Sequence, residues 1–226
     1  MATLYMVATP IGNLEDITYR AVRILKEVKL ITCEDTRHSR KLFSHYGIDT
    51  PFSSFHSHSP DRAIERVLDV LRSGGDVAYI SDAGTPAISD PGSVLVSAVV
   101  TEGFTVLPVP GPSALAALVS VSGLTGRGFW FEGFLSPKKG KRKKRLAELL
   151  ERGEAFVLYE SPHRIIAMLE ELAELDPVRE LVIGRELTKM HEEVLRGKAG
   201  ELAELLKKDN SVRGEFSLLV FTKKKK

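Results

Sequence analysis

The first half of the chain alternates short apolar runs with segments in which apolar residues return every three or four positions. Short runs rich in Val, Ile and Leu are typical of buried strands. We expect such strands at Leu4–Ala8, Leu30–Cys33, Val77–Ile80 and Thr105–Val109. Between the second and third, Ile64, Val67, Leu68 and Leu71 have the spacing of an amphipathic helix. This alternation of strands and helices predicts a mostly parallel sheet covered by helices.

The second half has a different pattern, which begins after the Gly- and Pro-rich stretch at 108–112 and a helix of small residues at 113–121. We expect strands at Phe129–Gly133, Ala155–Glu160, Glu180–Glu186 and Phe216–Phe221. Helical spacing at Leu146–Leu150 and Ile165–Leu175 separates the first three. The chain therefore divides into two α/β domains, which we place at residues 1–115 and 116–226.

The composition is that of an ordinary globular protein, with 43% hydrophobic and 27% charged residues among 226. Apolar runs such as Val94–Val100 are far too short to span a membrane. The N-terminus lacks the basic region of a signal peptide. The single cysteine, Cys33, allows no internal disulfide and no cluster for structural zinc. We therefore expect a cytoplasmic protein that contacts no membrane and holds no metal.

Positive charge is concentrated in one segment. Seven of the eight residues at 138–145 are Lys or Arg, and the chain ends in four lysines, although its net charge is only +2. Clustered cations favour a polyanionic partner; the alternatives are a solvated helix face for the first cluster and a disordered tail for the second. Gly140 and repulsion between like charges predict that the start of the first cluster is mobile until phosphates neutralise it.

Three loops that follow expected strands are rich in Gly, Pro and small polar residues: Thr9–Asn13, Ser81–Gly92 and Pro110–Ala114. In an open α/β sheet, ligands bind just beyond the carboxyl ends of the strands. These loops contain no Lys or Arg, and the chain has neither a G-x-G-x-x-G after the first strand nor a P-loop. They suit a ligand without phosphate, and S-adenosylmethionine is such a ligand. The alternative is that they are merely tight turns.

Eight blocks of the sequence form a recognisable set of motifs: Pro10–Thr18, Cys33–Arg37, Ser81–Pro86, Ile88–Gly92, Gly133–Leu135, Tyr159–Arg164, Arg185–Lys189 and His191–Glu193. These blocks resemble those of the ribosomal RNA small subunit methyltransferase I family, within the tetrapyrrole methylase superfamily. The resemblance runs from about residue 4 to residue 221. The Gly-Asp-Pro loop of the superfamily is Gly84-Thr85-Pro86 here, which makes Thr85, rather than an aspartate, the expected polar contact to the cofactor.

The resemblance implies two α/β domains of the tetrapyrrole methylase type, the first with a mostly parallel sheet and the second with a mixed sheet. It implies S-adenosyl-L-methionine as cofactor, bound in the cleft between them, and a homodimer. It also implies a substrate, the ribose 2′-oxygen of a cytidine in the decoding region of 16S rRNA, within the small ribosomal subunit. The cofactor-binding residues predicted on this basis are Pro10, Gly12, Ser81, Asp82, Ala83, Gly84, Thr85, Ile88, Ser113, Ala114, Gly133, Phe134 and Leu135.

Methyl transfer from a sulfonium is an in-line displacement, and orientation alone can lower such a barrier by about 7–11 kcal/mol. A base or a cation near the weakly acidic ribose hydroxyl can add about 10²–10⁴-fold. The candidates for that role are Glu34, Asp35, Arg37, Arg185, Glu186 and Lys189. For each of them the alternative is a structural salt bridge or a helix cap, and the sequence does not identify the base.

The predicted RNA contacts combine the basic segment with residues of other blocks. They are Lys138, Lys139, Lys141, Arg142, Lys143, Lys144, Arg145, Arg37, His56, His58 and Arg164. The two histidines have a spacing that could hold a metal, but no further ligand is evident, so RNA contact or capping of the following helix is the preferred interpretation. The aromatic side chains of Phe129, Trp130, Phe131 and Phe134 could stack on a base or on adenine, although core packing is the preferred interpretation.

Two other functions fit parts of this pattern. A precorrin or other tetrapyrrole methyltransferase would have the same cofactor loops, but a small macrocycle does not need seven clustered cations. A non-catalytic RNA-binding factor for ribosome assembly would use the cations but not three small-ligand loops. Binding of S-adenosylmethionine separates this last function from the other two.

Overall fold

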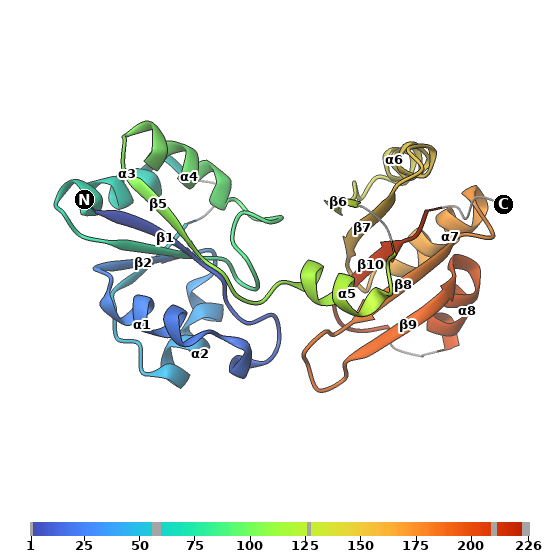
Figure 1. The fold of residues 1–226 in the computed structure, drawn as a ribbon, viewed down its shortest axis with the longest axis horizontal. Helices are drawn as coiled ribbons and strands as arrows, with labels where there is room; N and C mark the ends of the chain where they lie inside the picture. The colour runs from blue at the N-terminus through green and yellow to red at the C-terminus, as the bar shows by residue number, and fades with distance from the viewer. Residues whose placement is uncertain (1, 56–59, 126–127, 209–211, 223–226) are drawn as a thin grey trace. The chain divides into compact units, whose positions relative to one another are not determined.

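The computed structural model describes residues 2–55, 60–125, 128–208 and 212–222 (Figure 1). It contains two compact units, Met1–Ser113 and Ala114–Lys226, which we call unit 1 and unit 2 and describe separately. Predictions made for His56, His58 and the four C-terminal lysines lie outside the described residues. Within the described ranges, no helix combines the length and the apolar character that crossing a membrane requires.

Unit 1 is built on a five-stranded parallel sheet with the strand order β3-β2-β4-β1-β5. The strands are β1 (Thr3–Val7), β2 (Leu30–Cys33), β3 (Phe52–Ser54), β4 (Val77–Ile80) and β5 (Thr105–Val109). The four strands expected from apolar runs are confirmed, the first of them shifted by one residue. β2 and β4 are buried along their whole length, as expected for central strands covered on both faces.

Helices cover both faces of this sheet. α1 (Tyr19–Glu27) and α2 (Thr36–Tyr46) lie on one face, and α3 (Pro60–Arg72) and α4 (Gly92–Thr101) lie on the other (Figure 1). A short 3-10 helix, η1 (Leu14–Asp16), precedes α1. The Oγ1 atom of Thr18 caps α1 by accepting from the Ala21 N–H at 3.1 Å. α2 ends at Gly47, whose φ of 58° is the left-handed conformation that glycine adopts readily.

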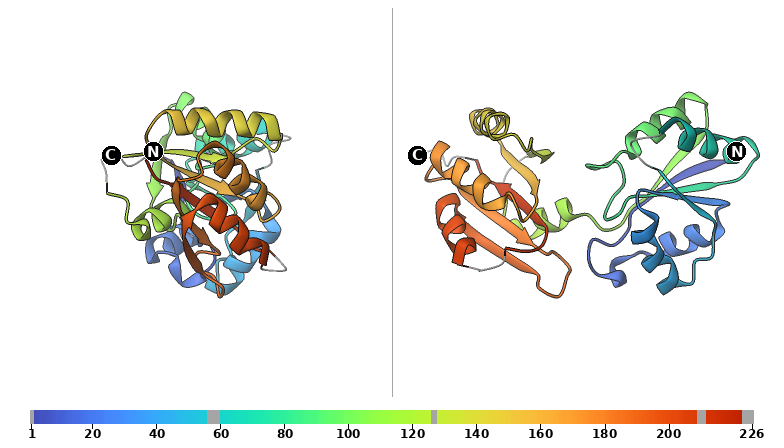
Figure 2. Two further views of the ribbon diagram at one scale, coloured as in Figure 1. Left: turned by 90° about the vertical axis from the view of Figure 1, so that its right-hand side faces the viewer. Right: turned by 180° about the vertical axis from the view of Figure 1, so that it is seen from behind.

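Unit 2 has a mixed sheet with the strand order β6-β7-β10-β8-β9. Its strands are β6 (Phe129–Phe134), β7 (Ala155–Glu160), β8 (Glu180–Arg185), β9 (Glu193–Lys198) and β10 (Phe216–Val220). Its helices are α5 (Ala114–Ser122), α6 (Lys139–Glu151), α7 (Ile165–Leu175) and α8 (Ala199–Lys208). Helices α6, α7 and α8 lie on one face of the sheet (Figure 2), and their apolar residues form one core with it.

The pairing of unit 2 brings several sequence blocks to one edge of its sheet. β6 is parallel to β7, and β10 is antiparallel to both β7 and β8. β6, β7 and β8 therefore run in the same direction and end at the same edge. The ends of these strands and the loops that follow them contain the blocks at 133–135, 159–164 and 185–189.

Two expectations about unit 2 are wrong or incomplete, and a third is confirmed. The basic segment is not an irregular start to a helix, because α6 already begins at Lys139 and contains Gly140. The elements β9 and α8 were not expected. The mixed character of the sheet is confirmed, because β10 is inserted antiparallel between β7 and β8.

Candidate functional site

The three Gly- and Pro-rich loops of unit 1 meet at the carboxyl edge of its sheet. The Thr9 N–H donates to the Gly84 carbonyl at 2.9 Å, and the Gly84 N–H donates to the Thr9 carbonyl at 3.0 Å. The Thr85 hydroxyl donates to the Pro112 carbonyl at 3.0 Å. These bonds join the loops after β1, β4 and β5, which contain the predicted cofactor residues from Pro10 to Ser113.

Gly84 is required at the point where two of these loops touch. Its φ is +79°, and a Cβ at this position would lie 3.2 Å from Cγ2 of Ile11. A side chain there would be strained whether or not a ligand is bound. A Gly84→Val substitution therefore cannot separate loss of cofactor contact from disturbance of the loops, and a test of the site needs another position.

Carboxylates without cationic partners gather at this edge. Glu34 follows β2, Asp82 follows β4 and Asp90 lies further along the same loop, and among the described residues none of the three has an ion pair. Burial, followed by the charges of Asp82 and Asp90, raises the pKa of Glu34 above its usual value. The Asp35 N–H donates to Oδ1 of Asp82 at 2.9 Å and joins the loops after β2 and β4. Carboxylates without cationic partners favour the binding of a positively charged ligand and disfavour the binding of a phosphate.

The sequence prediction missed Asp90. Its Oδ1 atom accepts from the hydroxyl of Tyr79 at 3.1 Å and from the Gly92 N–H at 2.7 Å, while its Oδ2 atom is buried without a hydrogen-bond partner. An aspartate two residues before a glycine is typical of an Asx turn, and that signal could have found it. The same loop holds Ala87 and Ser89 at φ values of 65° and 68°, which non-glycine residues rarely adopt.

Asp35 and Arg37 partner each other at the start of α2. Oδ1 of Asp35 caps the helix by accepting from the Arg37 N–H at 2.8 Å, and Oδ2 forms an ion pair with Nη2 of Arg37 at 2.7 Å. The hydrogen bonds from Arg37 lower the pKa of the Asp35 carboxyl well below its usual value. For these two candidates, the helix cap and salt bridge that the sequence left as alternatives are present.

The candidates in the loop after β8 also form ion pairs. Lys189 Nζ lies 2.9 Å from Oε1 of Glu186 and 3.1 Å from Oε2 of Glu215, and Arg185 lies 3.6 Å from Glu193. Burial opposes the charge of Glu186, but the bonds from Lys189 and from the Glu215 N–H outweigh it and lower the pKa of Glu186. A catalytic role for these residues stays a prediction.

The loops after β6 and β7 are joined in unit 2. The Arg164 guanidinium pairs with the buried Glu160 at 2.7 Å and donates to the Leu135 carbonyl at 3.4 Å. Gly133 has a φ of +74° beside a register shift in β6, and Phe134 is 55% exposed. Arg164 thus has internal partners, although the sequence suggested it as an RNA contact.

The structure separates the basic segment into paired and unpaired cations. Arg142 is only 5% exposed and forms two hydrogen bonds with Glu171, at 2.8 and 2.7 Å, so its prediction as an RNA contact is wrong. Lys143 pairs with Glu174, and Arg145 pairs with Glu132 and Glu148. The remaining cations are exposed, and within the described residues they have no ion pair: Lys138, Lys139, Lys141 and Lys144.

Most aromatic residues of β6 are not packed in the core, although core packing was the preferred interpretation. Phe129, Trp130 and Phe134 are exposed, so core packing is wrong for these three. The Arg152 guanidinium lies 4.1 Å from the centre of the Trp130 ring. Phe131 is half-buried and packs edge-on against Tyr159, with 5.1 Å between the ring centroids. In the described part of the chain, no group of three His, Cys, Asp or Glu side chains could hold a metal ion.

Known structures share this fold. A cobalt precorrin-4 methyltransferase has a TM-score of 0.73 at 17% identity and covers 97% of this chain and 94% of its own. A uroporphyrin-III C-methyltransferase from Thermus thermophilus, solved with S-adenosylhomocysteine, has a TM-score of 0.66 at 21% identity and covers 97% of each chain. The family model of the tetrapyrrole (corrin/porphyrin) methylases matches residues 3–203. The fold and the strand-end loops therefore define a protein of the tetrapyrrole methylase class.

Sequence relatives make the assignment narrower. The chain is 48% identical over 218 residues to ribosomal RNA small subunit methyltransferase I of Borrelia garinii, with 96% of this chain and 97% of the relative covered. It is 43% identical to the Bacillus subtilis protein of the same name, with 97% and 75% covered. The chain belongs to the ribosomal RNA small subunit methyltransferase I family of the tetrapyrrole methylases.

Proposed function

We propose that this chain is an S-adenosylmethionine-dependent methyltransferase that modifies 16S rRNA at the ribose 2′-oxygen of a cytidine in the decoding region. The observation that carries the proposal is the 48% identity, over nearly the full length of both chains, to a protein named ribosomal RNA small subunit methyltransferase I. We also propose that the chain acts on 16S rRNA within the small ribosomal subunit and that it forms a homodimer.

The cofactor site of the proposal is the carboxyl edge of the unit 1 sheet. Backbone and small side chains of 10–12, 81–88 and 113 hold the cofactor at this edge. A contribution of 114 and 133–135, which belong to unit 2, stays a prediction from the family resemblance. When bound, S-adenosylmethionine supplies a methyl group on a cationic sulfonium. The unpaired carboxylates of Glu34, Asp82 and Asp90 complement that charge, and the absence of Lys and Arg from the loops fits a ligand without phosphate.

Glu34 is the candidate that fits best as proton acceptor for the ribose hydroxyl. The other five candidates already have ion-pair partners, whereas Glu34 has none among the described residues. Its raised pKa also makes it a stronger base than an ordinary carboxylate. Activity then rises with pH as Glu34 loses its proton. Glu34→Gln lowers kcat by about 10²–10⁴-fold.

The function is tested with labelled S-adenosylmethionine and three substrates: assembled small subunits, naked 16S rRNA and a tetrapyrrole. We expect label in RNA, at a nucleotide whose 3′ phosphodiester resists alkaline hydrolysis because its 2′-hydroxyl is blocked. An alkali-labile labelled nucleotide would contradict ribose methylation. Label in the tetrapyrrole alone would contradict the RNA substrate.

Ala83 offers a test of the cofactor site that Gly84 does not. Ala83 is exposed in the loop after β4. We therefore expect Ala83→Phe to fold normally and to bind S-adenosylmethionine at least about tenfold more weakly, because the ring occupies space that the cofactor needs. Ala116→Phe, at another exposed alanine, in α5, is the size-matched control. Equal affinity for wild type and Ala83→Phe in calorimetry would contradict the proposal that the cofactor binds against this loop.

A further inference from the structure

Helix α2 has a charge composition that differs from every other helix of the described residues. It contains Arg37, His38, Arg40, Lys41 and His45 and no carboxylate. The other helices that carry cations also carry Asp or Glu, and α4 and α5 carry no charge at all. Its cations therefore have no acidic neighbour on their own helix.

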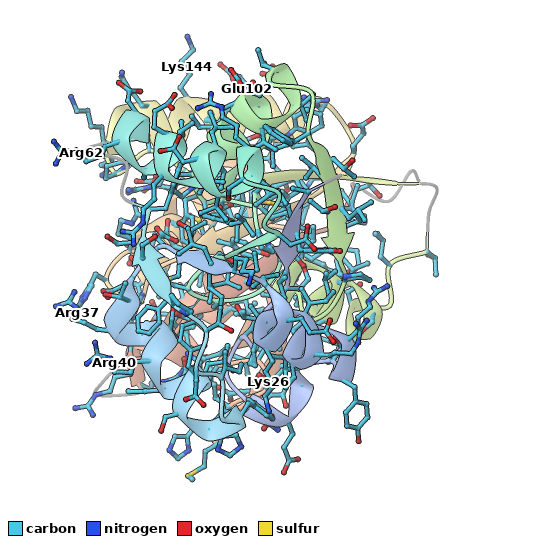
Figure 3. All side chains as sticks on the ribbon, turned by 90° about the vertical axis from the view of Figure 1, so that its left-hand side faces the viewer. Lys26, Arg37, Arg40, Arg62, Glu102 and Lys144 are labelled. Atoms are coloured by element: carbon cyan, nitrogen blue, oxygen red, sulfur yellow. The ribbon has the colours of Figure 1, made fainter. Side chains whose placement is uncertain are left out.

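The cations of α2 share the solvent-facing side of the helix. Ser39, Leu42 and Phe43 are buried against the sheet. The residues that alternate with them are exposed: Arg37, His38, Arg40, Lys41, Ser44 and His45. Figure 3 shows the side chains of Arg37 and Arg40 extending outward on the same side. The stripe from Arg37 to His45 is about 12 Å long at 1.5 Å per residue.

Most of this charge has no ion-pair partner among the residues that the structure describes. Arg37 is paired with Asp35, but Arg40 and Lys41 have no ion pair among the described residues. The neighbouring helices differ, since Arg23 of α1 pairs with Glu27 and Arg72 of α3 lies near three carboxylates. A stripe of exposed, unpaired cations attracts a polyanion.

α2 is also fixed to the edge that holds the proposed cofactor site. It begins directly after β2, and its capping residue Asp35 donates its N–H to Asp82 at 2.9 Å. A strand of RNA that places a ribose at this edge would have its neighbouring phosphates next to α2. Charges along one strand of a nucleic-acid duplex are spaced by about 3.4 Å, so the stripe can face several phosphates.

We propose that the solvent face of α2, with Arg40 and Lys41 at its centre, is a docking surface for the phosphate backbone of the RNA substrate. This surface is separate from the basic helix α6 and lies in the other unit. The inference rests on the proposed function for the identity of the polyanion. It concerns only how that RNA is held.

The test compares two doubly substituted chains in binding to a naked 16S rRNA transcript over a range of salt concentrations. Arg40→Gln with Lys41→Gln removes the centre of the α2 stripe. Arg20→Gln with Lys26→Gln removes the same charge from α1, on the same face of unit 1, where both residues are exposed. Arg37 is left in place because its loss would free Asp35 at the helix start.

We expect the α2 variant to flatten the plot of log affinity against log salt by about 1.4–1.8, which corresponds to two phosphate contacts. Its Kd should rise at least about tenfold at 0.1 M salt. The α1 variant should keep the wild-type slope, and Arg40→Lys with Lys41→Arg should keep most of the affinity. S-adenosylmethionine affinity and thermal stability should match wild type in all three.

An α2 variant with the wild-type salt slope, or an equal loss in the α1 variant, would overturn the inference while leaving the proposed function intact. A wild-type chain that binds cofactor but neither binds nor methylates RNA would overturn the proposed function instead. The two failures are therefore distinguishable in the same set of measurements.

Discussion

The charged side chains at the strand-end edge of the sheet differ between the two units in whether they form ion pairs. At the carboxyl edge of the unit 1 sheet, Glu34, Asp82 and Asp90 have no ion pair among the described residues. At the edge of the unit 2 sheet where β6, β7 and β8 end, the charged side chains pair with one another, as in Glu160 with Arg164 and Glu186 with Lys189. Uncompensated charge raises the free energy of the folded protein unless a ligand compensates it. The unit 1 edge is therefore the better candidate for a ligand site.

The two cationic helices show the same contrast. α6 has the denser run of Lys and Arg, but three of its cations pair with carboxylates on α6, α7 and β6. α2 has fewer cations and no carboxylate. The density of cations in a sequence thus overstates the charge that is available to a partner, because the compensating carboxylates can come from distant segments.

The largest effect is expected from breaking the buried pair of α6. Arg142 and Glu171 are 6% and 3% exposed at their side chains. Removing one partner of a buried pair leaves an uncompensated charge and destabilises the fold by about 3–5 kcal/mol. We therefore expect Arg142→Ala to lower the free energy of unfolding by that amount in urea titrations.

Two further variants sharpen this result. Lys144→Ala, at an exposed position of the same helix (Figure 3) that has no ion pair among the described residues, should stay close to wild type. Arg142→Met with Glu171→Met should recover much of the loss, because apolar replacement of a whole buried pair is often neutral or stabilising. If Arg142→Ala were as mild as Lys144→Ala, the pair would not be the structural element that its burial indicates.

The second effect concerns the cations of the basic segment, residues 138–145, that have no ion pair within the described part of the chain. Replacing Lys138, Lys139, Lys141 and Lys144 with Gln should flatten the salt slope of 16S rRNA binding by about 3, at 0.7–0.9 for each phosphate contact. As a single substitution, Lys141→Gln should flatten the salt slope by about 0.8. Lys143→Gln removes a cation that is already paired with Glu174 and should leave the salt slope unchanged. Equal slopes for these two single variants would mean that ion pairing within the protein does not decide which cations contact RNA.

Much of unit 1 could be predicted from the sequence because its central strands are buried on both faces. Such strands appear as continuous apolar runs, and the loops that follow them occupy the edge where ligands bind. The meeting of the loops at Gly84 needed the structure, since the Thr9–Gly84 bridge joins residues far apart in the chain. The unpaired state of Glu34 also depends on which residues fold beside it.

Less of unit 2 could be predicted, for two physical reasons. β9 is an edge strand with half-exposed residues, so it has no apolar run, and its neighbour α8 was missed with it. The partner of Arg142 lies 29 residues away on another helix, and no local pattern reveals such a pair. A local pattern also does not reveal which segments cover a strand, so the sequence could not show whether Phe129 and Trp130 of β6 are exposed or packed in the core.

The smallest effect is expected from the carboxylate edge of unit 1, and it has a definite sign. Burial and the charges of Asp82 and Asp90 raise the pKa of Glu34 above the value of about 4.3 that a glutamate has in the unfolded chain. The folded state then holds this proton more tightly than the unfolded state. Stability is therefore lost as the pH rises from about 4.3 through the folded pKa, and the loss is constant at higher pH.

Glu34→Gln removes this loss and keeps an oxygen that can accept a backbone hydrogen bond. The variant should be more stable than wild type at pH 7.5 and equal to it at pH 4, with a gain of about 0.5 kcal/mol or less because Glu34 is only half-buried. Thermal unfolding of both chains across this pH range measures the difference. In an Asp82→Asn background the gain should shrink, since one of the neighbouring charges is gone. A gain of the same size at pH 4, or one that Asp82→Asn does not change, would show that Glu34 is not held near unpaired carboxylates, and the contrast between the two edges would lose its basis.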